Sequence, residues 1–117
     1  MTRQRNDSHS TEFGIWLRVQ PQIDSSLGFL ASNIDYCWTN YKTGEWMFIE
    51  EKRYNTAIKY WQKKLFSIIH NVCRADKKYR GFHLLVFENT SPEDGKIFLD
   101  NKEISKEQLL NFLSFKL

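Results

Sequence analysis

The clearest pattern in the chain is the helical spacing of apolar residues between positions 56 and 73. These residues recur at intervals of three and four: Ile58, Trp61, Leu65, Ile68, Ile69 and Val72. Lys59 and Lys63 lie on the opposite side, and Asn55 or Thr56 precedes the run as a candidate N-cap. The spacing predicts an amphipathic helix that buries its apolar face.

A second pattern has the period of two that is typical of strands. Residues 32–40 alternate, with Ile34, Tyr36 and Trp38 on one face. The four residues "YKTG" (41–44) then have turn chemistry, and residues 46–53 return as a second strand. The pattern predicts a β-hairpin.

The remaining segments predict a central mixed sheet flanked by helices, an α/β fold of the α+β type. Residues 11–19 are expected to form a first helix and residues 106–114 a last one, opened by a Ser105–Gln108 capping box. The apolar run 82–88 predicts a central strand, and residues 96–104 a pair of short strands joined by a tight turn. Residues 23–31 have room for one more strand.

Length and composition limit the class of protein. The 117 residues fit one domain, expected over 11–117, behind a polar tail at 1–10 that we expect to be disordered. No apolar run is long enough for a transmembrane helix, and the tail has no apolar stretch of a signal peptide. Cys37 and Cys73 have no zinc spacing. We expect a cytoplasmic protein with free thiols and no membrane partner.

The net charge of +3 is small, but the charges are unevenly placed. Between Lys52 and Arg80 the chain has nine bases and one acid, Asp76, while Glu50 and Glu51 come directly before. Such a basic segment is typical of a polyanion-binding surface, and also of an ordinary solvated helix face.

The loop length of the hairpin decides what the acidic pair can do. A four-residue loop places Asp35 opposite Glu50, and a two-residue loop at Thr43–Gly44 places it opposite Lys52. Both registers gather Asp35, Glu50 and Lys52 on one face. A three-residue loop would pair Asp35 with Glu51 and break up this group.

Two carboxylates that lie close together repel each other, and a hard divalent cation relieves the repulsion. Mg²⁺ accepts one or two carboxylates together with water and substrate phosphate, and we expect Mn²⁺ to substitute for it. Such a cation can polarise a phosphodiester and lower the pKa of a water, with the lysine positioning that water or stabilising charge. Because E-x-K is a common triplet, a structural cluster of ion pairs is the other interpretation.

At these residues the chain resembles the PD-(D/E)xK nuclease superfamily, with "NIDY" and "IEEK" as the matching stretches. The resemblance implies a restriction-endonuclease-like αβββαβ core. It implies Asp35 and Glu50 as metal ligands, the backbone carbonyl of Glu51 as a further ligand, and Lys52 as the catalytic lysine. Ile34 stands where the motif has its proline.

The resemblance implies some further roles. A glutamate on the first helix would be Glu12, and a Gln or a base on the helix after the motif would be Gln62 or Lys59. The size of the chain is similar to that of small stand-alone members, such as Holliday junction resolvases and VRR-type nucleases. A homodimer that cuts both strands is one expected arrangement.

The expected function is metal-dependent hydrolysis of DNA phosphodiester bonds, as an endonuclease with structure-dependent substrate choice. Expected nucleic-acid contacts are Arg53, Tyr54, Lys59, Gln62, Lys63, Lys77, Lys78 and Arg80. The alternative is a non-catalytic module on a nuclease-like scaffold that binds nucleic acid or protein. The chain has no G-x-S-x-G, H-E-x-x-H or Walker A motif of other hydrolases.

Overall fold

The computed structural model describes residues 11–116, which fall into two compact units, 11–33 and 34–116. The expected tail at 1–10 lies outside the described residues. Among residues 11–116, no helix is both long enough and apolar enough to cross a membrane. Cys37 and Cys73 are free, as expected.

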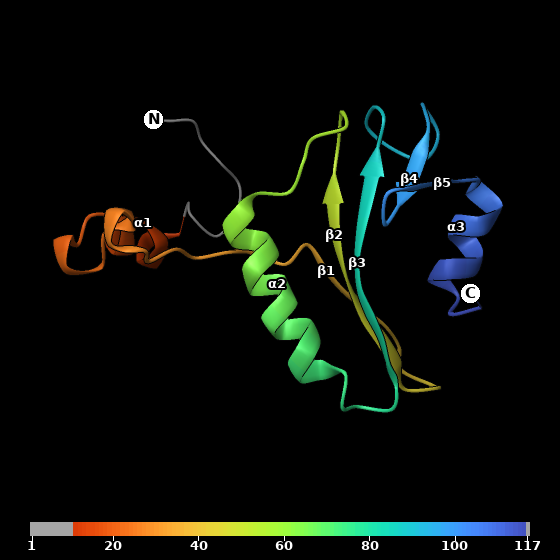
Figure 1. Cartoon of the computed structure of the whole chain (residues 1–117), viewed down its shortest axis with the longest axis horizontal. Coiled ribbons are helices and arrows are strands. Elements are labelled where there is room, and N and C mark those ends of the chain that lie inside the picture. The colour runs from red at the N-terminus through yellow and green to blue at the C-terminus, as the bar shows by residue number, and fades with distance from the viewer. Residues whose placement is uncertain (1–10, 117) are drawn as a thin grey trace. The chain divides into compact units, whose positions relative to one another are not determined.

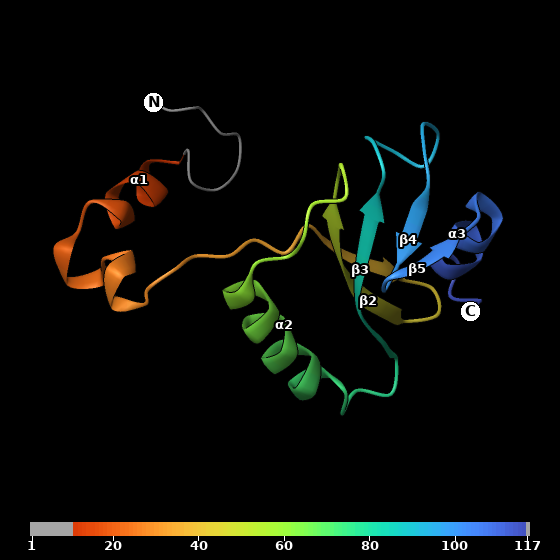
Figure 2. The same ribbon diagram turned by 45° about the horizontal axis from the view of Figure 1, so that its top comes forward.

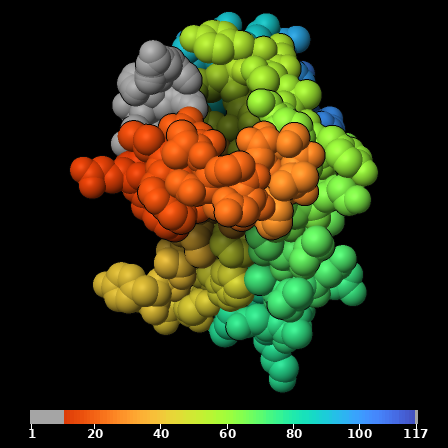
Figure 3. Space-filling view, turned by 90° about the vertical axis from the view of Figure 1, so that its left-hand side faces the viewer, coloured from red at the N-terminus to blue at the C-terminus, as the bar shows by residue number. Residues whose placement is uncertain are grey.

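The N-terminal unit contains three short helical elements. Helix α1 (Glu12–Arg18) follows Thr11, whose hydroxyl accepts a 3.0 Å hydrogen bond from the Gly14 N–H. Two 3₁₀ helices come next, η2 (Pro21–Ile23) and η3 (Ser25–Leu27), and none of the residues in these three elements is buried. Figure 3 shows the surface of this unit in red and orange.

The C-terminal unit contains a five-stranded mixed sheet in the order β1-β2-β3-β4-β5. Its strands are β1 (Tyr36–Asn40), β2 (Glu45–Lys52), β3 (Tyr79–Phe87), β4 (Ile97–Leu99) and β5 (Lys102–Ile104). β2 and β3 run parallel, and the other neighbours are antiparallel. Helices α2 (Tyr60–Cys73) and α3 (Lys106–Leu113) lie on opposite sides of the sheet (Figures 1 and 2). The predicted fold class is confirmed.

The further strand for which residues 23–31 have room is not formed. Pro21 opens η2, and Asp24 accepts hydrogen bonds from Ser26 at the start of η3. These turns end at Gly28, which has a φ of 98°. In the described chain, two strands instead of three precede α2, so a complete αβββαβ order is not observed.

The buried core lies between the sheet and α3. Met47 and Ile49 of β2 and Leu85 of β3 pack against Leu109 and Phe112 of α3. The predicted capping box is confirmed, since Ser105 accepts from the Gln108 N–H at 3.0 Å and Gln108 accepts from the Ser105 N–H at 2.8 Å. Because side chains alternate along β2, the residues between the core positions face α2.

Helix α2 packs through a different face from the predicted one. Its buried residue is Phe66, whose ring stacks on Phe82 of β3 at 4.4 Å between centroids. The expected core residues Trp61, Ile68 and Val72 are 46%, 60% and 72% exposed. The prediction was wrong because helical spacing marks an apolar stripe but does not say which stripe the sheet will cover.

The start of α2 also differs from the prediction. Lys59 is the N-cap, instead of Asn55 or Thr56. The chain first makes a turn in which Tyr54 and Asn55 have φ values of 55° and 54°. Their backbone N–H groups donate to the carbonyl oxygens of Asn89 and Phe87, which holds the segment at the end of β3. These tertiary hydrogen bonds keep residues 54 and 55 out of the helix, which begins only at Tyr60.

Strand β3 carries an irregularity at Gly81. Trp46 pairs with Tyr79 while Phe48 pairs with Phe82, so β3 has one extra residue there. Gly81 has a φ of 108°, and an added Cβ would lie 2.7 Å from Nε2 of His83. This position therefore requires glycine for its conformation and for its space.

We expect Gly81→Ala to lower the free energy of unfolding by about 1–3 kcal/mol, because it adds backbone strain to the clash with His83. Gly44→Ala is the matched control, since Gly44 also has a positive φ (84°) but its nearest neighbour is 3.9 Å away. Urea unfolding followed by circular dichroism measures both. Equal losses in the two variants would contradict a role for the contact with His83.

His83 joins β3 to the turn between β4 and β5. Its Nδ1 lies 2.8 Å from Oδ2 of Asp100, and its Nε2 lies 2.7 Å from the Arg80 carbonyl oxygen. Both neighbours are acceptors, so both ring nitrogens donate when the imidazole is protonated. Burial lowers the pKa of His83, but the bonds to Asp100 and Arg80 outweigh it and the pKa is raised above 6.5.

Because the folded protein holds this proton more tightly than the unfolded chain, His83 stabilises the fold fully below pH 6.5. We expect that contribution to be lost as the pH rises through the higher pKa of the folded state. Asp100→Asn removes the charge and should flatten this pH dependence. Urea unfolding at a series of pH values from 5 to 9 is the measurement. An unchanged slope in Asp100→Asn would show that another group titrates.

Candidate metal-binding and catalytic site

The turn between β1 and β2 fixes the register on which the site depends. Asn40 pairs with Glu45, so residues 41–44 form a four-residue loop. The Gly44 N–H donates to the Asn40 carbonyl at 2.8 Å, and the Asn40 side chain accepts from the Lys42 N–H at 2.9 Å. Tyr36 pairs with Ile49, and one residue further along Asp35 lies opposite Glu50. This is the four-residue alternative of the sequence analysis.

The two acids lie together at the end of the hairpin. The Asp35 N–H donates to Oε1 of Glu50 at 3.4 Å, and Oδ2 of Asp35 accepts from the Glu51 N–H at 2.9 Å. Glu50 is only 3% exposed, whereas Asp35 is exposed. Burial raises the pKa of Glu50, the negative charge of Asp35 raises it further, and Lys52 only partly offsets them.

Lys52 lies beside the buried acid. Its Nζ is 3.5 Å from Oε2 of Glu50 and 3.4 Å from Oε1 of Gln62 on α2. Oε1 of Gln62 also accepts from the Lys59 N–H at 3.3 Å, at the first turn of the helix. The side-chain amide of Gln62 therefore links the ammonium group of Lys52 on β2 to the first turn of α2.

Glu51 faces the other way, as alternation along β2 requires. Its carboxylate accepts a 3.2 Å hydrogen bond from the Tyr36 hydroxyl and lies 3.4 Å from Nε of Arg53. The charge of Glu51 and this bond raise the pKa of Tyr36. Because the carboxylate is engaged, the backbone carbonyl is the part of Glu51 that suits the metal role implied by the resemblance.

The acidic pair has the donor chemistry that Mg²⁺ uses. Within residues 11–116, no three His, Cys, Asp or Glu side chains are grouped to hold a metal ion. Mg²⁺ does not need such a group, since it typically takes one or two carboxylates and fills its other positions with water and phosphate. Glu50 is a buried carboxylate whose negative charge is disfavoured, and a cation would relieve that cost. Mn²⁺ suits the same oxygen ligands.

Glu12 lies in the first turn of α1, in the N-terminal unit, and is exposed. Its expected catalytic role stays a prediction.

The expected nucleic-acid contacts fall into two groups. The first group lies between the end of β2 and the first turn of α2 and comprises Arg53, Tyr54, Lys59, Gln62 and Lys63. Tyr54 is exposed, and the Lys59 ammonium lies over the Trp61 ring at 5.3 Å. Of this first group, Gln62 contacts Lys52 and Lys63 lines a cavity together with Glu50, whereas Arg53 pairs with Glu51.

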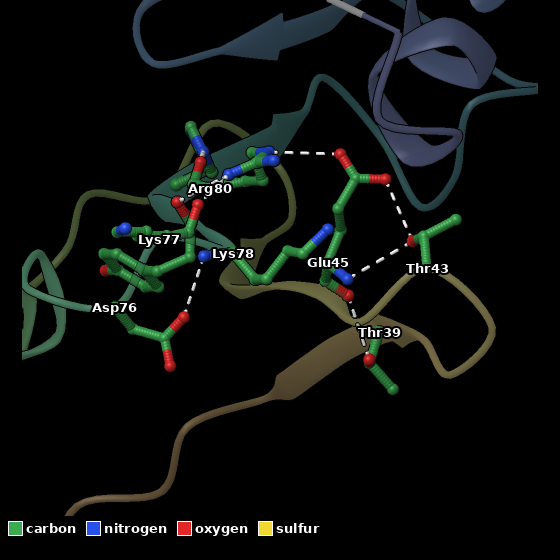
Figure 4. Close-up of polar contacts among 9 residues, drawn as sticks. Thr39, Thr43, Glu45, Asp76, Lys77, Lys78 and Arg80 are labelled. Atoms are coloured by element: carbon green, nitrogen blue, oxygen red, sulfur yellow. Dashed lines mark hydrogen bonds and ion pairs between the residues drawn. The ribbon is translucent and has the colours of Figure 1, made fainter.

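Lys77, Lys78 and Arg80 form the second group, at the beginning of β3 (Figure 4). Nε of Arg80 pairs with Glu45 at 3.1 Å, at the start of β2. Glu50 is five residues further along that strand, which corresponds to about 16 Å. The basic segment is therefore not one continuous strip beside the acids.

A cavity of about 240 Å³ opens beside Glu50, and most of its polar lining had not been singled out from the sequence. Ser67 and His70 of α2 line it together with His83 and Asp100 from the other side. Nδ1 of His70 lies 2.9 Å from the Tyr79 hydroxyl. These residues are far apart in sequence and share no motif, so only the fold brings them to Glu50.

Comparison with known proteins adds no relative to this description. No protein-family model, curated protein or solved structure matches the chain. The resemblance to the nuclease superfamily therefore depends on Asp35, Glu50 and Lys52 and stays a prediction.

We expect Glu50→Gln to raise the melting temperature in EDTA at pH 8, because the folded state disfavours the negative charge at this position. The folded carboxyl holds its proton above its usual pKa of 4.5, so wild-type stability falls as the pH rises through that region. The difference in melting temperature between Glu50→Gln and the wild type should decrease as the pH falls towards 4.5. Mg²⁺ should raise the melting temperature of the wild type and leave the variant unchanged.

Glu107→Gln, an exposed acid in the first turn of α3, is the control. Differential scanning fluorimetry across pH, with and without Mg²⁺, makes the comparison. A melting temperature of Glu50→Gln that is lower than the wild-type value at pH 8 would show that the ion pair with Lys52 outweighs burial.

Proposed function

We propose that the C-terminal unit is a Mg²⁺-dependent nuclease that hydrolyses DNA phosphodiester bonds. The observation that carries the proposal is the hairpin register, which sets Asp35 opposite the buried Glu50, with Nζ of Lys52 at 3.5 Å from the Glu50 carboxylate. Two carboxylates on neighbouring strands, with an ammonium group beside one of them, are the parts that metal-assisted hydrolysis of a phosphodiester needs.

Each residue then has a separate role. Asp35 and Glu50 would hold the cation, with the carbonyl oxygen of Glu51 as a further ligand. A bound Mg²⁺ supplies the charge that polarises the phosphodiester and makes a water more acidic. Lys52 orients that water or stabilises the charge that develops on the phosphate, and Gln62 holds Lys52 in place.

The reaction is a hydrolysis. The water oxygen forms a bond to phosphorus, the bond from phosphorus to the leaving sugar oxygen breaks, and a proton passes to that oxygen. The basic side chains around the end of β2 contact the phosphate backbone of the DNA strand. An endonuclease with structure-dependent substrate choice is the form of activity that we propose.

A homodimer would let each subunit cut one strand. The apolar residues Leu109 and Phe112 of α3 are used in the core. The exposed residues Trp61, Ile68 and Val72 of α2 are therefore the better candidates for self-association.

One observation favours the alternative of a binding module without catalysis. Glu50 is already paired with Lys52, and Glu51 with Arg53 and Tyr36, so the acids also form a satisfied cluster of ion pairs. Such a cluster can be purely structural. Catalysis is the better explanation for a carboxylate that is buried beside a second acid at a cost.

The test is cleavage of labelled duplex, single-stranded, flap and four-way-junction DNA with Mg²⁺, with Mn²⁺ and with EDTA. We expect cleavage with either metal and none with EDTA. Lys52→Ala should reduce the rate by about 100-fold or more, because it removes a group that stabilises charge in the transition state.

Two comparisons make the assay specific. Lys106→Ala removes an exposed lysine of α3 that pairs with Glu93, and it should cleave as the wild type does. Asp35→Asn keeps an oxygen that can accept from the Glu51 N–H, so it should fold normally and not cleave. DNA binding without cleavage under either metal would support the binding module.

A further inference from the structure

Two adjoining cavities cross the face of the sheet that α2 only partly covers. The first is the cavity of about 240 Å³ beside Glu50, and the second has a volume of about 420 Å³. Ile58, Lys63 and Leu84 line both of them, so Lys63 lies where the two meet. The two cavities therefore adjoin at Lys63, with Glu50 in the lining of the first one.

The second cavity has an apolar floor and a polar rim. Leu84 and Val86 of β3 and Phe98 of β4 line its floor, and Val86 pairs with Phe98 in the sheet. The polar residues Asn55 and Asn101 also line it. An apolar surface with a few polar groups is typical of small-ligand pockets, and the volume lies within their usual range of about 300–1,000 Å³.

Lys63 supplies the positive charge beside this floor. In the described part of the chain, Lys52, Arg53, Arg80 and Lys106 each pair with a glutamate, but Lys63 forms no such ion pair. A free ammonium group beside an apolar slot suits a nucleotide, since the phosphate contacts the ammonium and the flat base lies on the apolar floor.

We propose that the second cavity receives one unpaired nucleobase of the substrate strand, next to the phosphate that is held between Lys63 and the acidic pair. This inference rests on the proposed function and names its substrate class: DNA with an unpaired nucleotide at the cleavage position. A base stacked in a duplex cannot enter a cavity of this kind, because it must first leave its neighbours. The floor stabilises a base that is already unstacked.

The experiment compares DNA hairpins that differ at one position. One is fully paired, one has a single bulged nucleotide, and one has an abasic site in place of the bulged base. Binding is measured by fluorescence anisotropy in EDTA, so the result does not depend on cleavage. We expect the bulged hairpin to bind about tenfold more tightly than the other two, as one base contact with an apolar or aromatic surface would give.

Two pairs of variants test the cavity itself. Ala57→Trp fills the second cavity from an exposed loop residue, and Ala75→Trp places the same side chain in the turn after α2. Lys63→Ala removes the ammonium group, and Lys64→Ala removes a neighbour that contacts Tyr60 and lines neither cavity. Ala57→Trp and Lys63→Ala should lose the tenfold preference, and their partners should keep it.

The outcomes separate this inference from the proposed function. A preference for the bulged base that survives Ala57→Trp, or that is absent from the wild type, would overturn the base pocket. In that case, metal-dependent cleavage that needs Lys52 would still support the proposed nuclease activity. A preference for the bulged hairpin that depends on the cavity, without any cleavage, would support the base pocket and contradict the proposed nuclease activity.

Discussion

The hydrogen-bonded turn from Asn40 to Gly44 is the constraint on which the rest of the C-terminal unit depends. It fixes the pairing of β1 with β2, and with it which side chains of β1 share a face with which side chains of β2. A slip of one residue would turn Trp38 of β1, whose indole N–H donates to the Leu113 carbonyl at 2.8 Å, away from α3, and it would take Asp35 away from Glu50. The core and the candidate site are therefore specified by the same register.

This double use explains how the fold tolerates the acidic pair. Burying Met47 and Ile49 stabilises the unit by about 1.5–3 kcal/mol for each side chain, which offsets the cost of holding Glu50 out of water. Glu50 directly follows the core residue Ile49, and side chains alternate along β2. The stabilisation by the core and the cost of burying Glu50 therefore come from the same strand. A stable core on one face allows a strained group of charges on the other.

Helix α2 joins the site to the sheet through polar as well as apolar contacts. Gln62 bonds to Lys52, Phe66 stacks on Phe82, and His70 bonds to Tyr79, so three turns of the helix are each fixed to the strands. This arrangement leaves Trp61, Ile68 and Val72 exposed. It also leaves part of the sheet beside Lys63 uncovered, and that uncovered part forms the cavities.

Local patterns in the sequence determined the hairpin, a central strand and the capping box at Ser105, because turn residues and side-chain period act within a few positions. The central strand was predicted at 82–88 and is formed by Tyr79–Phe87. They also limited Asp35, Glu50 and Lys52 to one face of a sheet, although three loop lengths were open. Only the tertiary structure selected the four-residue loop. It also set the start of α2 at Tyr60 through bonds to the end of β3, turned Phe66 inward instead of Trp61, and separated Arg80 from Lys63. Each of these depends on contacts between segments far apart in the chain, and no local pattern carries that information.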